Sequence, residues 1–185
     1  MLKQTHSYPL TLPLKAQWLA KIAKHLARKQ LQKKPHPVFQ IRLPDNSIYL
    51  ERHTVFKTKF CTLYYHRFVQ SDDDATFHTH PWPSISLSLT GETHELVPQD
   101  LNNPLPARYK TIRHKQGSIV IRKRSCLHRI ALPQNSEYAE TLILTGPNTQ
   151  TWFFCSPTGK MFPWRRWLKI PEKISNDSRP AHKKS

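Results

Sequence analysis

Residues 78–90 read HTHPWPSISLSLT and carry the two patterns that decide the fold and the candidate site. From Ser84 to Thr90, hydroxyl and aliphatic side chains alternate strictly, which predicts a β-strand with one polar and one apolar face. His78 and His80 stand two residues apart, so on an extended chain both imidazoles point to the same side. If the register continues through the intervening prolines, that side is also the hydroxyl side. The segment therefore predicts two histidines and a row of serines that face one polar cavity.

The alternation continues along most of the chain. Runs rich in β-branched and aromatic residues follow one another at short intervals, and turn residues such as Pro44-Asp45-Asn46 separate many of them. We expect strands at residues 38–43, 47–57, 60–70, 84–90, 92–98, 107–114, 117–123, 127–132, 139–146 and 150–155. About ten short strands without helical crossovers favour an all-β fold, an antiparallel sandwich or barrel.

Residues 14–32 have the period of a helix instead. The apolar residues Leu14, Trp18, Leu19, Ile22, Ala23 and Leu26 share one face, lysines and Arg28 fill much of the rest, and prolines follow at residues 35 and 37. We expect the apolar stripe to pack on the domain with a solvated lysine face. A basic amphipathic helix can also lie on a membrane or on nucleic acid.

The expected organisation has three parts. Residues 1–37 form a basic helical extension, residues 38–170 form the β-domain, and residues 171–185 form a polar, lysine-bearing tail that we expect to be disordered. Phe162, Trp164 and Trp167 are expected to pack a C-terminal segment against the domain.

The net charge is +17, and it is unevenly distributed, since the first 44 residues contain nine Lys or Arg and no Asp or Glu. Such a balance favours polyanionic partners: nucleic acid, anionic lipid or a phosphorylated substrate. Simple solubility is the plainer explanation. The candidate polyanion-binding residues are Lys21, Lys24, Arg28, Arg122, Lys123 and Arg124.

The three cysteines, Cys61, Cys126 and Cys155, are widely spaced and do not indicate a disulfide framework. No apolar run approaches the roughly 20 residues that a transmembrane helix needs, and we see no signal peptide at the N-terminus. We therefore expect a cytoplasmic protein.

A third histidine, His128, lies in a segment that begins with Gly117 and ends in an expected strand. Imidazole suits zinc, copper, iron and nickel, so convergence of His78, His80 and His128 would create a transition-metal centre. The chain has eleven histidines, and it is the third residue that distinguishes this set from a chance pair.

The spacing of these histidines resembles that of the cupin family. Its first motif, G-x5-H-x-H-x3/4-E-x6-G, corresponds here to Asp72-x5-His78-x-His80-x3-Ser84-x6-Gly91. Its second motif, G-x5-P-x-G-x2-H-x3-N, corresponds to Gly117-x5-Lys123-x-Ser125-x2-His128-x3-Leu132. The words HTHPW and LHRI also resemble small phage and bacterial cupin-like proteins. The resemblance spans roughly residues 48–155 and implies a double-stranded β-helix, or jelly-roll, barrel that holds a metal.

One departure from the family pattern bears on the chemistry. Ser84 stands where cupins have a metal-binding glutamate, so the resemblance implies a centre of three histidines with open positions for water, substrate or dioxygen. That arrangement is similar to the thiol dioxygenases, which use ferrous iron, while zinc hydrolytic sites also use three histidines and water. A carboxylate from elsewhere, Glu92, Glu95 or Glu140, could complete the usual shell.

The expected function is that of a small metalloenzyme of the Fe(II)-dependent dioxygenase type, with zinc, nickel and manganese as alternative metals. Ser84, Ser86, Tyr64 and Arg67 are the candidate cavity residues, since an arginine or tyrosine there could hold a substrate carboxylate or phosphate. The alternative is a non-catalytic module that binds nucleic acid through its basic surface. A homodimer is expected by analogy with cupins.

Overall fold

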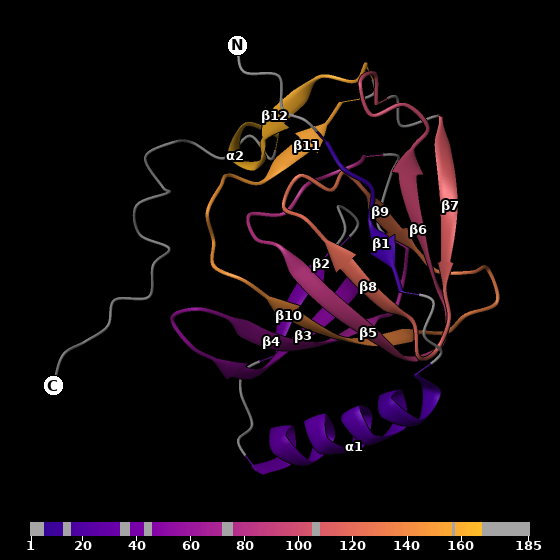
Figure 1. Ribbon diagram of the computed structural model, residues 1–185, viewed down its shortest axis with the longest axis vertical. Coiled ribbons are helices and arrows are strands. Elements are labelled where there is room, and N and C mark those ends of the chain that lie inside the picture. Colours follow the sequence, from indigo (N-terminus) through magenta and orange to yellow (C-terminus); the bar gives the residue numbers. More distant parts are fainter. Residues whose placement is uncertain are drawn as a thin grey trace, which may run out of the picture.

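Antiparallel sheets make up nearly all of the fold (Figure 1). The computed structural model describes residues 6–12, 16–33, 38–42, 46–71, 76–104, 108–156 and 158–167. The strands are β1 (Leu10–Thr11), β2 (Phe39–Arg42), β3 (Ile48–Lys57), β4 (Thr62–Phe68), β5 (Ser84–Thr90), β6 (Thr93–Pro98), β7 (Tyr109–His114), β8 (Ile119–Arg122), β9 (Arg129–Ala131), β10 (Ala139–Thr145), β11 (Phe153–Cys155) and β12 (Met161–Pro163). The helices are α1 (Gln17–Lys33) and α2 (Trp164–Trp167).

The largest sheet has seven strands in the order β1-β8-β5-β10-β4-β3-β2, and every pair of neighbours is antiparallel. Its two faces differ as the alternation of residues 84–90 predicts. Ser84, Ser86 and Ser88 are buried on the inner face, while Ile85 points outward and is exposed. The inner face of the sheet is therefore polar at its centre.

A three-stranded sheet, β7-β6-β9, lies across from the large sheet. The chain around His78 extends it, because the His78 N–H donates to the His128 carbonyl (2.9 Å) and the His128 N–H donates back to the His78 carbonyl (3.1 Å). On its other side this segment pairs with the β11–β12 hairpin, where the Thr79 N–H donates to the Phe153 carbonyl (2.9 Å). The histidine segment thus becomes an inner strand between two others.

The ten strands expected from the sequence are all present, with ends shifted by a few residues. The sequence did not predict β1, β12 or α2, which are too short to show a period. β1 pairs with β8, so the N-terminal extension also contributes a strand to the large sheet. The expected tail, residues 171–185, lies outside the described residues.

Helix α1 covers part of the outer face of the large sheet, below β5 and β10 in Figure 1. The expected apolar stripe packs only in part: Ala23 lies against the core and Leu19 is half-buried, but the larger residues of the stripe point away from it. Ala20 and Ala27 are buried against Tyr65 and Leu89, whereas Trp18 is 68% exposed and Ile22 and Leu26 are also exposed. The outer face of the sheet under α1 carries bulky side chains, so the small alanines allow the closest approach of the helix.

Two ion pairs hold α1 in this position. The Lys24 ammonium lies 2.5 Å from one oxygen of Glu140, and Arg28 donates to the other oxygen at 2.8 Å. Burial of Glu140 opposes its ionisation, but Lys24 and its other hydrogen-bond donors outweigh burial and lower the pKa of this carboxyl to about 2. The carboxylate of β10 therefore binds the helix at neutral pH.

Candidate metal centre

A cavity of about 490 Å³ lies between the two sheets. Serines of β5, aromatic residues and the three motif histidines line it, together with Arg42, Arg52 and Arg122. None of its described lining residues is acidic. A concave site of this kind, mostly apolar with a few polar groups, is typical of a small-molecule site.

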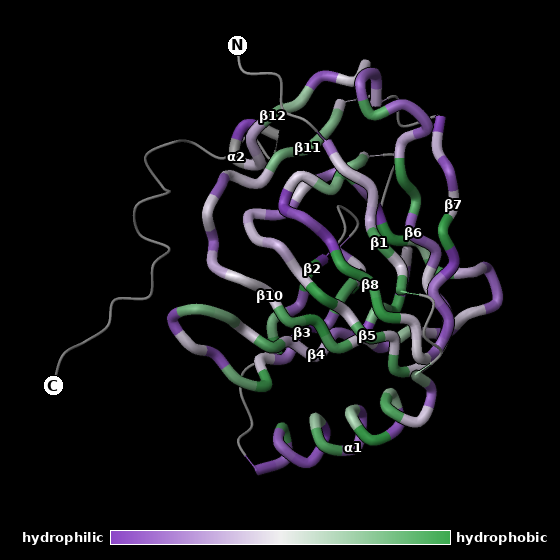
Figure 2. Tube along the Cα trace, in the orientation of Figure 1, coloured by the Kyte–Doolittle hydropathy of each residue, from purple (hydrophilic) through white to green (hydrophobic). Residues whose placement is uncertain are grey.

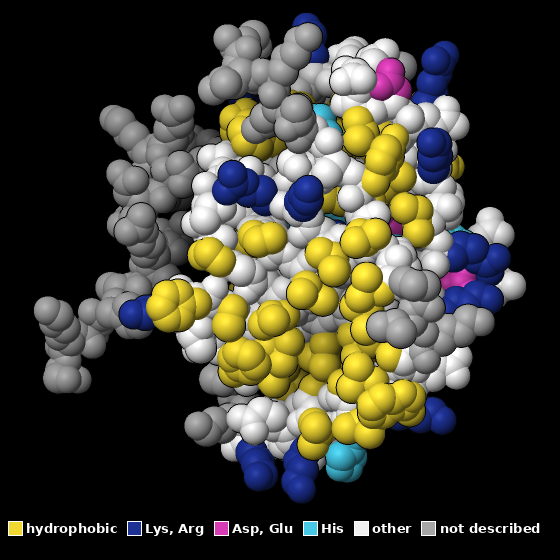
Figure 3. Space-filling view, in the orientation of Figure 1, with side chains coloured by type: hydrophobic (Ala, Val, Ile, Leu, Met, Phe, Trp, Pro, Cys, Tyr) yellow, Lys and Arg dark blue, Asp and Glu magenta, His cyan; other side chains and the backbone are white. Residues whose placement is uncertain are grey.

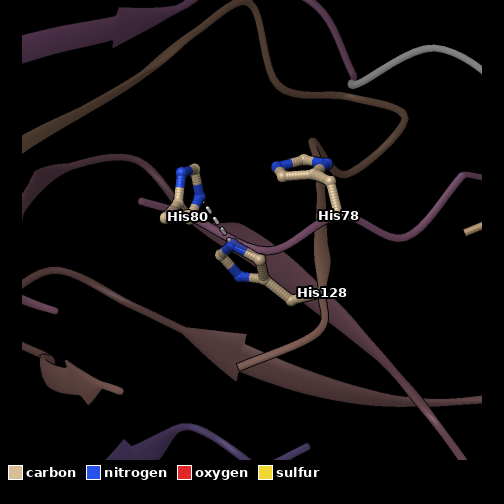
Figure 4. A group of neighbouring side chains, drawn as sticks. All are labelled: His78, His80 and His128. Carbon is tan, nitrogen blue, oxygen red and sulfur yellow. Dashed lines mark hydrogen bonds between the residues drawn. The ribbon is translucent and has the colours of Figure 1, made fainter. Parts of the chain in front are cut away.

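The three histidines of the sequence motifs converge at this cavity (Figure 4). The Nε2 atoms of His80 and His128 are 3.0 Å apart, and one nitrogen of each of the three rings lies within 4.8 Å of the others. His78 and His80 reach the site from the segment before β5, and His128 reaches it from the turn before β9. The backbone pairing of residues 78 and 128 brings the two motifs together.

The protonation of these rings suits metal binding. Burial lowers the pKa of His78 to about 4, and burial also lowers the pKa of His80 and of His128. All three imidazoles are therefore neutral at pH 7, which is the form that binds a metal. His80 and His128 are in hydrogen-bond contact with each other through Nε2. Three neutral imidazoles that lie this close together fit a divalent transition metal.

Glu95 of β6 orients His128. Its carboxylate contacts Nδ1 of His128, which makes Nδ1 the protonated nitrogen and leaves the lone pair of Nε2 for a metal. Glu95 thus lies on the far side of the ring from the Nε2 cluster. Glu95, Cys126 and His128 also form a compact group, but burial raises the pKa of the Cys126 thiol, which disfavours the thiolate that a metal needs.

A buried ion pair keeps Glu95 charged. Arg122 donates to both carboxylate oxygens, from Nε at 2.7 Å and from Nη2 at 2.8 Å, and Nε2 of His114 lies 2.7 Å from the carboxylate. Burial opposes ionisation of Glu95, but the charge of Arg122 outweighs burial and holds the pKa of Glu95 well below its usual value. Arg122, a candidate polyanion-binding residue, is therefore an internal residue paired with Glu95 and is not part of the exposed surface.

Aromatic rings enclose the histidines on the other side. The indole of Trp82 stacks on His80, with ring centroids 4.5 Å apart and planes 9° apart. Trp152 lies 5.9 Å from the His80 ring and 6.0 Å from the His78 ring. This packing fixes the orientation of the two rings and surrounds them with apolar surface.

The serine row provides the polar wall. Nη1 of Arg122 donates to the Ser86 hydroxyl at 2.7 Å, so Ser86 is already bonded. The buried Ser84 hydroxyl has no hydrogen-bond partner among the described residues. Because an unpaired buried hydroxyl is costly, Ser84 is suited to bond water or a ligand in the cavity.

The arginine beside the cavity is Arg52 of β3 and not the expected Arg67 of β4. Arg67 lies on the outer face, 3.7 Å from Glu51 and with its guanidinium over the Tyr138 ring. Arg52 pairs in register with His66 on the inner face, and its Nε–H donates to Nε2 of His66 at 3.0 Å. Alternation alone did not reveal which face of β4 is inner, because aromatic residues occur on both.

Tyr64 also lies outside the cavity wall, although it shares a face with His66. The guanidinium of Arg52 lies 5.1 Å from the centre of its ring. Tyr64 thus supports Arg52 from the side rather than facing the cavity. No described carboxylate lies within ion-pair distance of Arg52, whose printed contacts are the Tyr64 ring and the hydrogen bond to His66.

The structure also places the other charged candidates. Lys24 and Arg28 are paired with Glu140, while Lys21, Lys123 and Arg124 are exposed. Of the other carboxylates proposed to complete the shell, Glu92 pairs with His94 and Arg113 near the surface, and Glu140 lies on the outer face of the large sheet under α1. None of these carboxylates reaches the Nε2 cluster.

No family model matches the chain, and no curated protein does. Solved structures similar to it include hydroxypropylphosphonic acid epoxidase from S. wedmorenis (TM-score 0.47, 13% identity, 60% of this chain and 55% of that chain). The EutQ protein of Clostridium difficile (TM-score 0.45, 12%, 62% and 83%) and an RmlC-like cupin protein from Ralstonia eutropha (TM-score 0.45, 10%, 72% and 77%) are also similar.

The chain spans little more than half the length of the epoxidase chain. At these low similarities, the function is inferred from the geometry of the site alone. Among the described residues, no helix is long and apolar enough to cross a membrane.

Proposed function

We propose that this protein is a metal-dependent enzyme whose centre is formed by His78, His80 and His128. The convergence of three neutral imidazoles on one point of a cavity carries the proposal; His78 and His128 are buried and His80 is half-buried. Three ligands on one side of an ion leave positions open toward the cavity. In the cupin motif a glutamate would fill one of these positions. Here Ser84 stands at that place in the motif, and it lines the cavity.

Ferrous iron is the metal we infer, and the reaction class is that of a dioxygenase. Three histidines with positions left open toward the cavity support this choice, and zinc, nickel and manganese are the alternative metals. When bound, ferrous iron supplies activation of dioxygen at its open positions. The chain itself orients His128 through Glu95, packs Trp82 and Trp152 against the other two histidines, and offers the Ser84 hydroxyl to a bound molecule.

The substrate we infer is a small anion that Arg52 binds. Arg52 has no carboxylate partner among the described residues, and its charge is close enough to His80 to contribute to the lowered pKa of that ring. A molecule that binds the metal with one group and Arg52 with a carboxylate or phosphoryl group would satisfy both ends of the cavity. The absence of acidic residues from the described lining agrees with this charge.

Metal analysis tests the centre. Protein purified without a histidine tag or added metal should contain close to one equivalent of a transition metal, or take up one on anaerobic addition of Fe(II). His78→Ala and His128→Ala should each lose it. His94→Ala is the matched control, because His94 is also bonded to a glutamate but lies outside the cluster. Wild-type protein that binds neither Fe(II) nor Zn(II), Ni(II) or Mn(II) would exclude the proposal.

Anion binding is tested separately, on the metal-free protein. Acetate and inorganic phosphate should raise the melting temperature of the wild type at constant ionic strength, relative to chloride. Arg52→Met should weaken the apparent affinity about tenfold or more, since it removes charge-assisted hydrogen bonds. Arg67→Met, on the outer face of the same sheet, should behave as the wild type. A normal response of Arg52→Met would exclude Arg52 as the anion site without affecting the metal centre.

A further inference from the structure

An apolar row crosses the outer face of the large sheet beside α1. Strand pairing aligns Leu10 with Ile121, Ile121 with Ile85, Ile85 with Leu144, Leu144 with Leu63, and Leu63 with Phe56. Four of these six side chains are exposed, from 37% for Leu144 to 58% for Leu10. The next row toward α1, which includes Leu87, Leu142 and Tyr65, is covered by the helix. The exposed row is thus the part of the sheet face that α1 leaves open.

Helix α1 extends this apolar surface instead of closing it. Trp18, Ile22 and Leu26 follow one another at a spacing of four residues and are all at least half exposed. Figure 3 shows apolar side chains continuing from the sheet down to the helix without a charged group between them. We call the row and these three helix residues the apolar face. A contiguous exposed apolar surface of this kind marks an interaction site.

The charges around the apolar face are basic. Lys21 and Lys29 lie on α1, and Lys59, whose ammonium is 4.8 Å from the centre of the Phe60 ring, lies on the β3–β4 hairpin. Figure 3 shows Lys and Arg at the margins of the face and no acidic side chain within it. The described acidic residues of this side of the sheet, Glu51 and Glu140, are already paired with arginine or lysine.

The charges around the apolar face indicate which kind of partner can bind there. A second copy would place basic margins against basic margins, and the described carboxylates on this side of the sheet, Glu51 and Glu140, are already paired. The net charge of +17 adds to the repulsion. Nucleic acid requires cations where this face has aliphatic side chains. A bilayer that contains anionic lipid offers both an apolar interior for the centre and negative headgroups for the margins.

We propose that the apolar face docks on the surface of an anionic lipid bilayer. Trp18, Ile22 and Leu26 enter the boundary between headgroups and acyl chains together with the exposed row of the sheet, and the surrounding lysines contact lipid phosphates. α1 lies in the plane of the membrane and does not cross it. The docking is independent of the metal centre, whose ligands face the interior.

Flotation of the full-length protein with lipid vesicles tests the proposal. The protein should float with vesicles of phosphatidylcholine and phosphatidylglycerol. Binding should increase with the share of anionic lipid and decrease with added salt. The double variant Trp18→Gln/Ile22→Gln should weaken the partition coefficient about tenfold or more, because two large apolar contacts are lost. Ile85→Thr/Leu144→Thr should weaken it similarly without touching the helix. Phe39→Gln, which removes a side chain that is 62% exposed on β2, is the matched control and should bind as the wild type.

Several outcomes would overturn the proposal. One is that the wild type stays in solution in the presence of anionic vesicles. Another is that Phe39→Gln loses as much binding as the double variants. Sedimentation analysis that shows a wild-type dimer, converted to a monomer by Ile85→Thr/Leu144→Thr, would assign the face to a second copy. Binding to duplex DNA that the double variants weaken would assign it to nucleic acid. The metal-free variant His128→Ala should float normally, which separates this test from that of the proposed function.

Discussion

Arg122→Met is expected to lower the free energy of unfolding by roughly 3–5 kcal/mol. The substitution keeps much of the length of the side chain but removes the counter-charge of Glu95, which has no exposed surface. The carboxylate would then remain buried among imidazoles and hydroxyls with one negative charge uncompensated. Urea denaturation at neutral pH, followed by fluorescence, measures the change.

The chain contains its own control for this experiment. Arg113 donates from Nε to Glu92 at 2.7 Å, the same separation as between Nε of Arg122 and Glu95, but its side chain is 63% exposed. Arg113→Met should therefore cost no more than about 1 kcal/mol. Equal losses of unfolding free energy in the two variants would show that burial does not determine how much the Arg122–Glu95 ion pair stabilises the fold. Glu95 would then not be held as a buried ion.

The strands could be predicted from the sequence because most of them have one buried and one solvated face. β5 is the clearest case: its alternation is strict, and Pro83 and Gly91 mark its ends. Helix α1 shows the limit of the same reasoning. Its largest apolar residues were assigned to the packing face, yet a close approach to bulky strand residues favours alanine, and amphipathicity does not reveal that preference.

The site was predictable to a similar extent. The histidines could be found because they lie on one face of an extended segment and at motif spacing from a third. Glu95 and Arg52 could not be assigned in the same way. β6 is buried on both faces, so its sequence does not show which face Glu95 occupies, and the position of Arg52 depends on strand pairing with β4, which is not a local property.

Glu95→Gln is the substitution from which we expect the second large effect, a loss of metal affinity of about ten- to a hundredfold. At present the carboxylate accepts the proton of Nδ1 of His128, which leaves Nε2 as the lone-pair donor. A glutamine can turn its amide N–H₂ toward Nδ1, which stabilises the other tautomer, with the proton on Nε2. In that tautomer His128 cannot bind a metal. Anaerobic titration with Fe(II), or with Co(II) as a spectroscopic probe, measures the affinity.

Glu92→Gln is the control that separates orientation of a ligand from loss of charge. Glu92 lies three residues before Glu95 in the sequence. Its carboxylate is 2.8 Å from Nε2 of His94, and Arg113 is its cationic partner. It therefore repeats the carboxylate, histidine and arginine of the Glu95 cluster outside the metal centre. Glu92→Gln should leave the affinity unchanged. If Glu95→Gln also bound Fe(II) like the wild type while remaining folded, Glu95 would have no part in orienting His128, and the tautomer of that ring would have to be set by the metal itself.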